Sequence, residues 1–200
     1  VWKQYLVDAL PDTGVASIVD LACGNGDITR RLAATYPQAA ITGIDLCDAM
    51  LHLARRNLAD GRVTLIEADL TDTGLANACA DVVTAGYALR NAPDLDDALR
   101  EISRILKPGG TLAVLDFAKS PRRLTWRIQW LLLWIWGGLW GVLLHFNPVV
   151  YGYIAASLAR FPDRNALTAR LAAHGLSIVM RQRRFLGMAE ALIVRKTDSA

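Results

Sequence analysis

Short apolar segments alternate with amphipathic ones through most of the chain. Apolar runs typical of buried strands stand at 15–22, 39–45, 62–69, 80–87 and 111–118. Segments with the three- and four-residue spacing of amphipathic helices stand at 27–36, 46–58 and 95–107. Nearly all-apolar strands that alternate with helices are typical of a parallel sheet covered on both faces. This pattern predicts an α/β fold.

The end of the chain departs from this alternation. A helix is expected over 163–175, where Gly175 ends it, and strands over 176–185 and 188–196 are close enough to pair as an antiparallel hairpin. A chain of this length forms one domain. We therefore expect a single domain over 1–200, with a Rossmann-like, seven-stranded, mostly parallel sheet whose last strand is antiparallel.

Composition and charge exclude several classes of protein. The net charge is only +3 and the basic residues are scattered, so we expect no nucleic-acid partner. The three cysteines form no CxxC pair, which favours a reduced, cytoplasmic protein. No cluster has the spacing of metal ligands, so no metal is expected. The chain begins at Val1 without a methionine, and we expect further residues upstream.

The loop after the first strand is the first candidate binding site. In an open parallel sheet the ligand lies beyond the carboxyl ends of the strands. The sequence there is "DLACGNGDIT", in which Gly24 and Gly26 allow a tight turn and a close approach to a ligand. Thr29 stands where the dinucleotide-binding pattern requires a third glycine, which argues against a nicotinamide or flavin cofactor.

Acidic residues at three successive strand ends define the ligand further. Asp20 is placed to accept from an ammonium group, Asp45 from ribose hydroxyls, and Asp69 from an adenine amino group. A ligand with a cation, a ribose and an adenine but no phosphate fits these groups. S-adenosylmethionine (SAM) is such a ligand.

Five stretches then resemble a known family. They are "VDLACGNGDIT", "GIDLCDAML", "EADL", "AGYALRNAPDLDDALREISRILKPGG" and "LAVLDFAKSP". They resemble the class I SAM-dependent methyltransferases and, more narrowly, the ubiquinone/menaquinone C-methyltransferase (UbiE/COQ5/MenG) family, whose most specific feature is "LRN" followed by a helix and "RILKPGG". The resemblance implies an enzyme that uses SAM and releases S-adenosylhomocysteine. The cofactor-binding residues expected from both arguments are Asp20, Ala22, Gly24, Gly26, Asp45, Leu46, Met50, Asp69, Leu70 and Gly86.

The resemblance also implies which residues face the methyl acceptor. Arg90 and Asn91 of "LRN" correspond to a pair implicated in deprotonating the acceptor through water. Arginine is a poor base, so Arg90 would stabilise an oxyanion, or else only tie down its loop. Asp116 is a third catalytic candidate. Expected substrate-binding residues are Tyr87, Trp130, Trp134, His145, Tyr151 and Tyr153, of which His145 could be a base or structural and the last two could be pocket walls or proton donors.

One segment differs from the family. The uncharged run Trp130–Leu144 is about fifteen residues long, whereas a membrane-spanning helix needs roughly twenty. Tryptophan favours membrane interfaces, and Arg122, Arg123 and Arg127 could meet anionic lipid. A membrane span and a plain core helix remain alternatives, but we expect residues 118–160 to form a helical cap that lines a hydrophobic acceptor site.

These expectations leave three functions open. The first is C-methylation of a quinone or quinol precursor of ubiquinone or menaquinone. The second is methylation of another hydrophobic acceptor, such as a phospholipid amine or a natural product, at C, N or O. The third is a non-catalytic methyltransferase-like scaffold. We expect a cytoplasmic protein with peripheral contact at the inner face of the membrane; the sequence does not indicate its oligomeric state.

Overall fold

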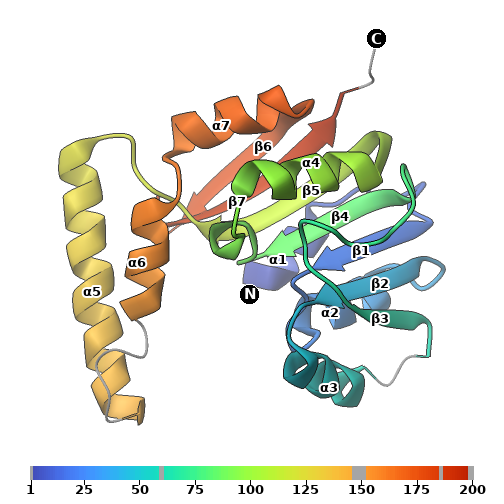
Figure 1. The fold of residues 1–200 in the computed structure, drawn as a ribbon, viewed down its shortest axis with the longest axis horizontal. Helices are drawn as coiled ribbons and strands as arrows, with labels where there is room; N and C mark the ends of the chain where they lie inside the picture. Colours follow the sequence, from blue (N-terminus) through green and yellow to red (C-terminus); the bar gives the residue numbers. More distant parts are fainter. Residues whose placement is uncertain (1, 59–60, 146–151, 185–186, 198–200) are drawn as a thin grey trace.

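Seven strands form one sheet across the middle of the molecule (Figure 1). The structure, a computed structural model, describes residues 2–58, 61–145, 152–184 and 187–197. The strands are β1 (Ser17–Leu21), β2 (Ala40–Asp45), β3 (Val63–Glu67), β4 (Ala80–Gly86), β5 (Leu106–Phe117), β6 (Leu176–Arg184) and β7 (Ala189–Lys196). Their order in space is β3-β2-β1-β4-β5-β7-β6. β1 to β5 pair in parallel, and β7 is antiparallel to both β5 and β6. This confirms the predicted sheet.

The fifth strand begins earlier than the sequence suggests. β5 starts at Leu106, opposite Ala80, and the pairing with β4 resumes at Thr111, opposite Val82. Residues 107–110, "KPGG", therefore form an irregularity within the strand rather than a loop before it.

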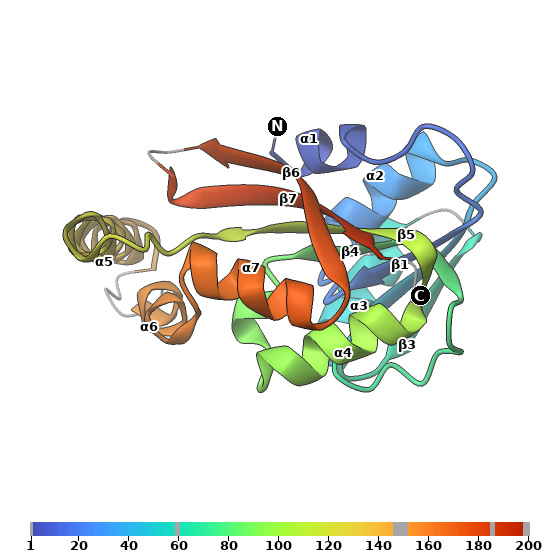
Figure 2. The same cartoon turned by 90° about the horizontal axis from the view of Figure 1, so that it is seen from above.

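Helices cover both faces of the sheet. They are α1 (Trp2–Asp8), α2 (Asp27–Thr35), α3 (Asp48–Asn57), α4 (Leu95–Ile105), α5 (Arg123–His145), α6 (Gly152–Arg160) and α7 (Arg164–Ala173), with a 3-10 turn, η1 (Leu89–Asn91). α1 and α2 bury their apolar sides on one face, and α4, α6 and α7 bury theirs on the other (Figure 2). α3 packs against β2 and β3 at the far edge of the sheet. α1 is the one helix of these that the sequence pattern did not predict.

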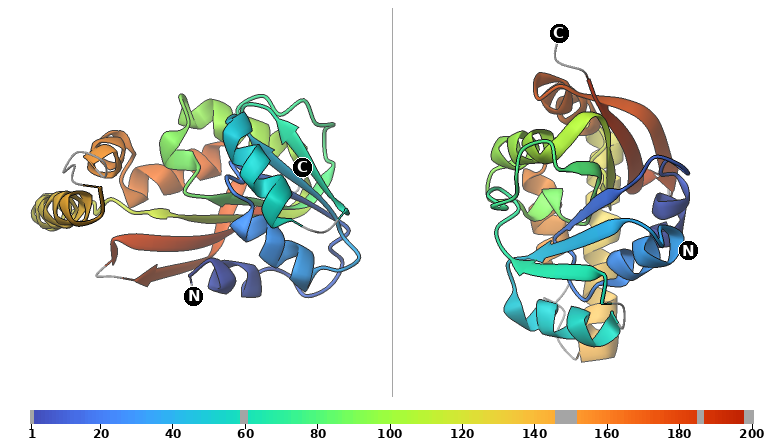
Figure 3. Two further views of the ribbon diagram at one scale, coloured as in Figure 1. Left: turned by 90° about the horizontal axis from the view of Figure 1, so that it is seen from below. Right: turned by 90° about the vertical axis from the view of Figure 1, so that its right-hand side faces the viewer.

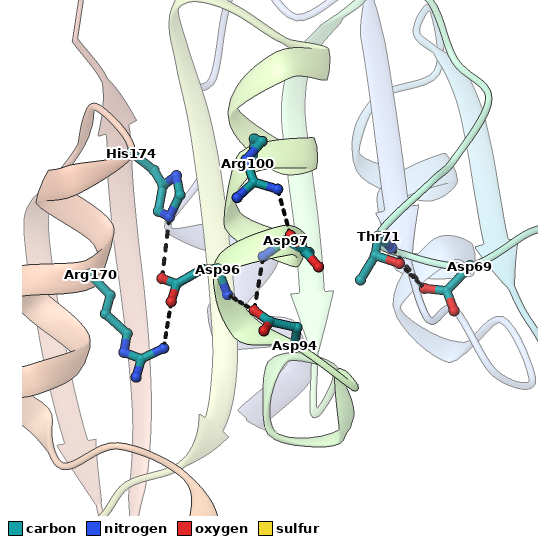
Figure 4. Close-up of polar contacts among 8 residues, drawn as sticks. All are labelled: Asp69, Thr71, Asp94, Asp96, Asp97, Arg100, Arg170 and His174. Atoms are coloured by element: carbon teal, nitrogen blue, oxygen red, sulfur yellow. Dashed lines mark hydrogen bonds and ion pairs between the residues drawn. The ribbon is translucent and has the colours of Figure 1, made fainter.

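α4 shows how the sequence sets helix boundaries. Its N-cap, Asp94, accepts from the backbone N–H of Asp96 at 2.7 Å and of Asp97 at 3.2 Å (Figure 4). The carboxylate of Asp96 lies 2.7 Å from the guanidinium of Arg170, which is in α7. It also lies 3.3 Å from the ring of His174, the residue directly after α7. These contacts fix α4 beside α7 and so fix the position of the turn that precedes α4.

α5 and α6 lie at one end of the molecule. Figures 1, 2 and 3 place both helices beyond the carboxyl ends of the parallel strands, with α5 outermost. They occupy most of the segment 118–160 that we predicted as a cap. Within the described residues, no helix combines the length and the apolar character that a membrane crossing requires.

The opposite end of the sheet is held by a polar cluster around Asp81. Its Oδ2 accepts from the backbone N–H of Ala16 and Ser17 at 3.0 and 2.9 Å, and its Oδ1 accepts from Nζ of Lys107 at 2.7 Å. Partial burial alone would raise the pKa of Asp81, but these hydrogen bonds outweigh it and hold the pKa at about 2. The cluster joins β1, β4 and β5 far from the carboxyl-end loops.

Asp81→Asn should therefore lower the free energy of unfolding by about 1–2 kcal/mol near pH 7, allowing for the partial exposure of Lys107. Because the folded pKa lies below the unfolded value, this contribution is present above about pH 4 and is lost as the pH falls toward 2. Urea unfolding at several pH values measures it. Glu67→Gln, at an exposed position of β3, is the control. If it lowered the free energy of unfolding as much as Asp81→Asn, the stabilising role assigned to the Asp81 cluster would be contradicted.

Candidate functional site

The site begins with a carboxylate buried in the middle of the sheet. Asp20 of β1 is only 1% exposed. Its Oδ2 accepts from the hydroxyl of Thr29 on α2, and its Oδ1 accepts from the hydroxyl of Thr84 on β4, both at 2.6 Å. These two bonds tie α2 and β4 to β1, and the expected contact of Asp20 with the ligand's ammonium group stays a prediction.

Burial dominates the electrostatics of this region. It raises the pKa of Asp20 to about 6, although the bonds from Thr29 and Thr84 act to lower it. Burial, followed by the nearby charges of Asp20 and Asp45, raises the pKa of Cys23 to about 12. The Cys23 thiol is therefore neutral and unsuited to act as a nucleophile.

The glycine loop folds against the end of β2. The backbone N–H of Gly24 donates to Oδ2 of Asp45 at 2.7 Å, and the N–H of Cys47 donates to Oδ1 at 2.9 Å. Gly24 and Gly26 both have positive φ, 56° and 79°. A Cβ on Gly24 would meet nothing within 4 Å, so the loop has open space in front of it. The loop and the half-buried Asp45 carboxylate thus share one edge of that space.

Residues beside Asp45 provide an apolar surface. Leu46 is 66% exposed and Met50, on the first turns of α3, is 42% exposed. Asp69 lies two residues beyond β3, and its Oδ1 accepts from the N–H and the hydroxyl of Thr71 at 2.8 and 2.7 Å (Figure 4). Asp69 and Leu70 are both half-buried. The ends of β2 and β3 therefore present two carboxylates and two exposed apolar side chains.

Backbone strain is concentrated at the same edge. Ala22, directly after β1, has φ 50°, and Tyr87, directly after β4, has φ 59°. Side chains other than glycine rarely adopt this conformation, and it recurs at functional sites. At the end of β4, a Cβ on Gly86 would lie 2.3 Å from Cδ1 of Ile28, so a larger residue there would require the Ile28 side chain to move. Ala22 and Tyr87, two of the predicted site residues, thus occupy positions with special backbone demands.

A second buried carboxylate lies near the end of β5. Asp116 of β5 accepts from Nε of Arg90 at 3.1 Å and from the backbone N–H of Arg90 at 3.2 Å. The guanidinium also donates to the hydroxyl of Ser157 on α6 and lies over the ring of Phe117. Burial raises the pKa of Asp116, against the lowering effect of Arg90. This geometry favours the loop-tying alternative for Arg90, because its side chain is almost wholly buried.

The neighbour of Arg90 is placed differently. Asn91 is exposed, and its side-chain amide donates to the carbonyl of Tyr87 at 3.0 Å. The Tyr87 ring packs against Phe117, with ring centroids 5.8 Å apart. Burial, with the charge of Asp116, raises the pKa of the Tyr87 hydroxyl. The "LRN" turn therefore brings Asn91 and Tyr87 together above a buried ion pair.

Two hollows flank this turn. A cavity of about 510 Å³ is lined by η1, the start of α4, and residues of α6 and α7, among them Arg90, Asn91, Ser157 and Arg160. A groove of about 400 Å³ lies between α5 and α6, where Trp126, Arg127, Trp130, Leu131 and Ala159 line it. Polar groups thus surround the first hollow, and aromatic and aliphatic groups the second.

The predicted cap residues are described only in part. Trp130 is 39% exposed on the groove, and Trp134 is 59% exposed one turn further along α5. His145 ends α5 and Tyr153 lies in α6, but their side chains, and all of Tyr151, lie outside the described residues. No cluster of three potential metal ligands occurs in the described part of the chain.

Sequence reasoning missed the residues that support the site. The hydroxyls of Thr29 and Thr84 meet Asp20, and that of Ser157 meets Arg90. The mismatch of Thr29 with the dinucleotide pattern was a usable signal, since a polar residue at that position needs a partner. Thr84 and Ser157 are far from their partners in the sequence, so no local pattern indicated them.

Solved structures establish the fold family. A SAM-dependent methyltransferase from Mesorhizobium loti superposes with a TM-score of 0.68 at 18% identity, over 96% of this chain and 95% of that one. Another from Aquifex aeolicus gives a TM-score of 0.69 at 13% identity, over 98% and 89%. Together with the strand order and the carboxyl-end loops, this likeness defines the fold of a class I SAM-dependent methyltransferase.

The particular family follows from the sequence comparison. The chain belongs to the ubiE/COQ5 methyltransferase family, which it matches over residues 1–194. It is 31% identical to a demethylmenaquinone methyltransferase of Chlamydia pneumoniae, over 98% of this chain and 84% of that protein. It is 39% identical to a ubiquinone/menaquinone biosynthesis C-methyltransferase of Syntrophotalea carbinolica, over 82% and 69%. The protein is therefore a SAM-dependent methyltransferase, as the sequence predicted.

Thr84→Val tests the support of the buried carboxylate. Losing one hydroxyl donor to Asp20 should cost about 1–3 kcal/mol of unfolding free energy. The pKa of Asp20 in the folded protein is raised, so ionisation of Asp20 destabilises the fold. The hydrogen bond from Thr84 stabilises the ionised carboxylate. Its loss should therefore lower the free energy of unfolding more near pH 8, where Asp20 is ionised, than near pH 5. Thr64→Val, at an exposed position of β3, should change stability by less than about 0.5 kcal/mol. A cost independent of pH would contradict this account.

Proposed function

We propose that this enzyme transfers a methyl group to a ring carbon of a lipophilic quinol precursor of the ubiquinone or menaquinone type. The observation that carries the proposal is the "LRN" turn of η1, held by a buried ion pair at the carboxyl edge beside the glycine loop. Membership of the ubiE/COQ5 family supports the same acceptor class, because relatives at 31–39% identity bear the names of quinone C-methyltransferases.

The residues at the ends of β1 to β3 fit SAM. Asp45 has both carboxylate oxygens at the edge of the open space before Gly24, suited to two ribose hydroxyls. The exposed side chains of Leu46 and Met50 suit an apolar adenine face. Asp69 has lone pairs beyond those that Thr71 uses, suited to the adenine amino group. SAM would supply an electrophilic methyl group at this edge.

In this proposal, groups of the chain orient the quinol ring and assist the loss of its phenolic proton. We assign Asn91 and the Tyr87 loop to contact with the quinol, since both border the carboxyl edge and Asn91 is exposed. Attack by a ring carbon requires loss of a phenolic proton, which water can take while polar donors stabilise the oxygen. The new carbon–carbon bond would form as the sulfur–methyl bond breaks. The proton on the methylated ring carbon must then leave and a proton return to the oxygen, so that the product keeps both hydroxyls. Arg90 and Asp116 then act as positioning residues, because their charged groups are occupied with each other.

The proposed acceptor also suggests a role for the groove between α5 and α6 and a location for the enzyme. The groove of Trp126, Arg127, Trp130, Leu131 and Ala159 is suited to the apolar tail of such a substrate. Quinol precursors with long tails dissolve in membranes. We therefore propose a cytoplasmic enzyme that makes peripheral contact with the inner face of the membrane.

Asp45→Asn tests the cofactor half of the proposal. Replacing a carboxylate that bonds two ribose hydroxyls should weaken SAM binding by about 10- to 100-fold in calorimetry. Asp48→Asn provides a matched control three residues away, because its exposed carboxylate pairs only with neighbours on α3. Equal affinity for SAM in the Asp45 variant and the parent would remove Asp45 from the site.

Asn91→Ala tests the acceptor half. With SAM and a short-tailed quinol precursor, the parent enzyme should yield a product in which a methyl group replaces a ring hydrogen and both phenolic hydroxyls remain. Mass spectrometry and NMR can show this. The variant should lose about 100-fold in kcat while its SAM affinity and Tm stay near the parent values. The exposed Asn165 gives the control variant Asn165→Ala.

Other outcomes would redirect the proposal. Methylation of a phospholipid amine or of a phenolic oxygen instead of the ring carbon would overturn the acceptor class. Failure to bind SAM would overturn the enzymatic function. Arg90→Ala is a poor test, because an uncompensated buried Asp116 should cost about 3–5 kcal/mol and confound activity with folding.

A further inference from the structure

α5 presents its apolar side to solvent. Trp126, Gln129 and Leu133 recur every three or four residues and pack toward the body of the molecule, where Gln129 is 3% exposed. The opposite side of the helix bears an apolar row with exposed fractions between 48% and 72%. This row, which we call the outer row, consists of Leu124, Ile128, Leu131, Ile135 and Leu139, of which Leu131 also borders the groove beside α6. An exposed apolar stripe of this length on an outermost helix marks an interaction surface.

Charge around the outer row is of one sign. Residues 117–162 contain no Asp or Glu and five Lys or Arg, which leaves 17 basic against 19 acidic residues in the rest of the chain. The whole positive surplus of the protein therefore lies in the segment that carries α5. Arg122 and Arg123 are exposed at its start, next to Leu124. An anionic surface complements this arrangement.

The aromatic composition points to the same kind of surface. Five of the six tryptophans of the protein lie in α5, at positions 126, 130, 134, 136 and 140. Trp130 and Trp134 are exposed, and Trp134 adjoins Leu131 of the outer row, three residues before it on the helix. Tryptophan side chains are stable at the boundary between lipid headgroups and hydrocarbon. A helix with an apolar stripe, tryptophans and adjacent arginines has the features of one that lies in a membrane interface.

We propose that the outer row of α5, with Arg122 and Arg123, docks this protein on a bilayer surface that contains anionic lipids. The inference rests on the proposed function for its purpose, since the bilayer would hold the acceptor. α5 lies beyond the carboxyl ends of the strands (Figures 1 and 2), so a docked bilayer lies at the end of the molecule that carries the site. A second copy of the chain fits this face less well, because its own segment 117–162 would bring basic residues and no acidic residue to pair with them.

Vesicle binding without SAM or acceptor tests the proposal. The protein should sediment with vesicles of phosphatidylcholine plus phosphatidylglycerol and far less with phosphatidylcholine alone. Tryptophan emission should shift to shorter wavelength on binding, and brominated lipids should quench it, because most of the tryptophans lie in α5. An emission spectrum that vesicles leave unchanged would overturn the docking surface.

Two variants separate charge from apolar contact. The double variant Arg122→Glu/Arg123→Glu should weaken binding to anionic vesicles by about 30-fold or more. The matched double variant Arg56→Glu/Arg100→Glu makes the same charge change on exposed positions of α3 and α4 and should keep most of the binding. The variant Leu124→Ser/Ile128→Ser/Ile135→Ser should abolish the emission shift while leaving Tm near the parent value.

Two results would overturn the proposal. One is equal loss of binding in both arginine double variants, which would indicate a non-specific charge effect. The other is a dimer in light scattering that the serine variant dissociates, which would assign the outer row to a second copy. Failure here leaves SAM binding and transfer to a short-tailed acceptor intact. Failure of the proposed function leaves vesicle binding intact, so the two are distinguishable.

Discussion

The carboxyl edge of the sheet depends on one buried carboxylate with two hydroxyl donors. Asp20 lies in the central strand β1, and Thr29 and Thr84 reach it from α2 and from β4. A buried ion without such partners would cost several kcal/mol, so both hydroxyls stabilise the close packing of the three elements. The same bonds fix the start of α2, and with it the glycine loop whose N–H meets Asp45.

A second buried pair performs the corresponding task on the acceptor side. Arg90 and Asp116 join η1 to β5, and Ser157 extends the contact to α6. α6 bears one wall of the groove against α5, and the Arg90 guanidinium is one of the contacts that connect α6 to the "LRN" turn. A carboxylate inside the sheet thus supports each half of the proposed site, next to the half-buried Asp45 and the exposed Asn91 respectively.

The sequence predicted the architecture well because its signals are local. Apolar runs, the helical spacing of apolar residues and the glycine after α7 each act over a few residues, and the seven-stranded sheet followed from them. The early start of β5 was missed because proline and two glycines are typical of a loop, whereas the pairing of Leu106 with Ala80 is a contact between distant segments. Burial is equally non-local. Asp20 and Asp45 look alike in the sequence, yet only the packing of α2 makes one a support and leaves the other at the surface.

The Trp-rich helix α5 also shows that a local sequence pattern does not reveal which side chains are buried. Its composition alone allowed a membrane span, a core helix or a cap, since hydropathy does not say which side of a helix is covered. The structure resolves this for the described residues, because Trp126, Gln129 and Leu133 face the body and the outer row faces away. An apolar surface of that size is unfavourable in water. Its retention on an outermost helix, in the segment that holds the whole positive surplus, is best accounted for by a partner that is both apolar and anionic. A bilayer surface meets both conditions at once, and it is also where a long-tailed quinol would be found.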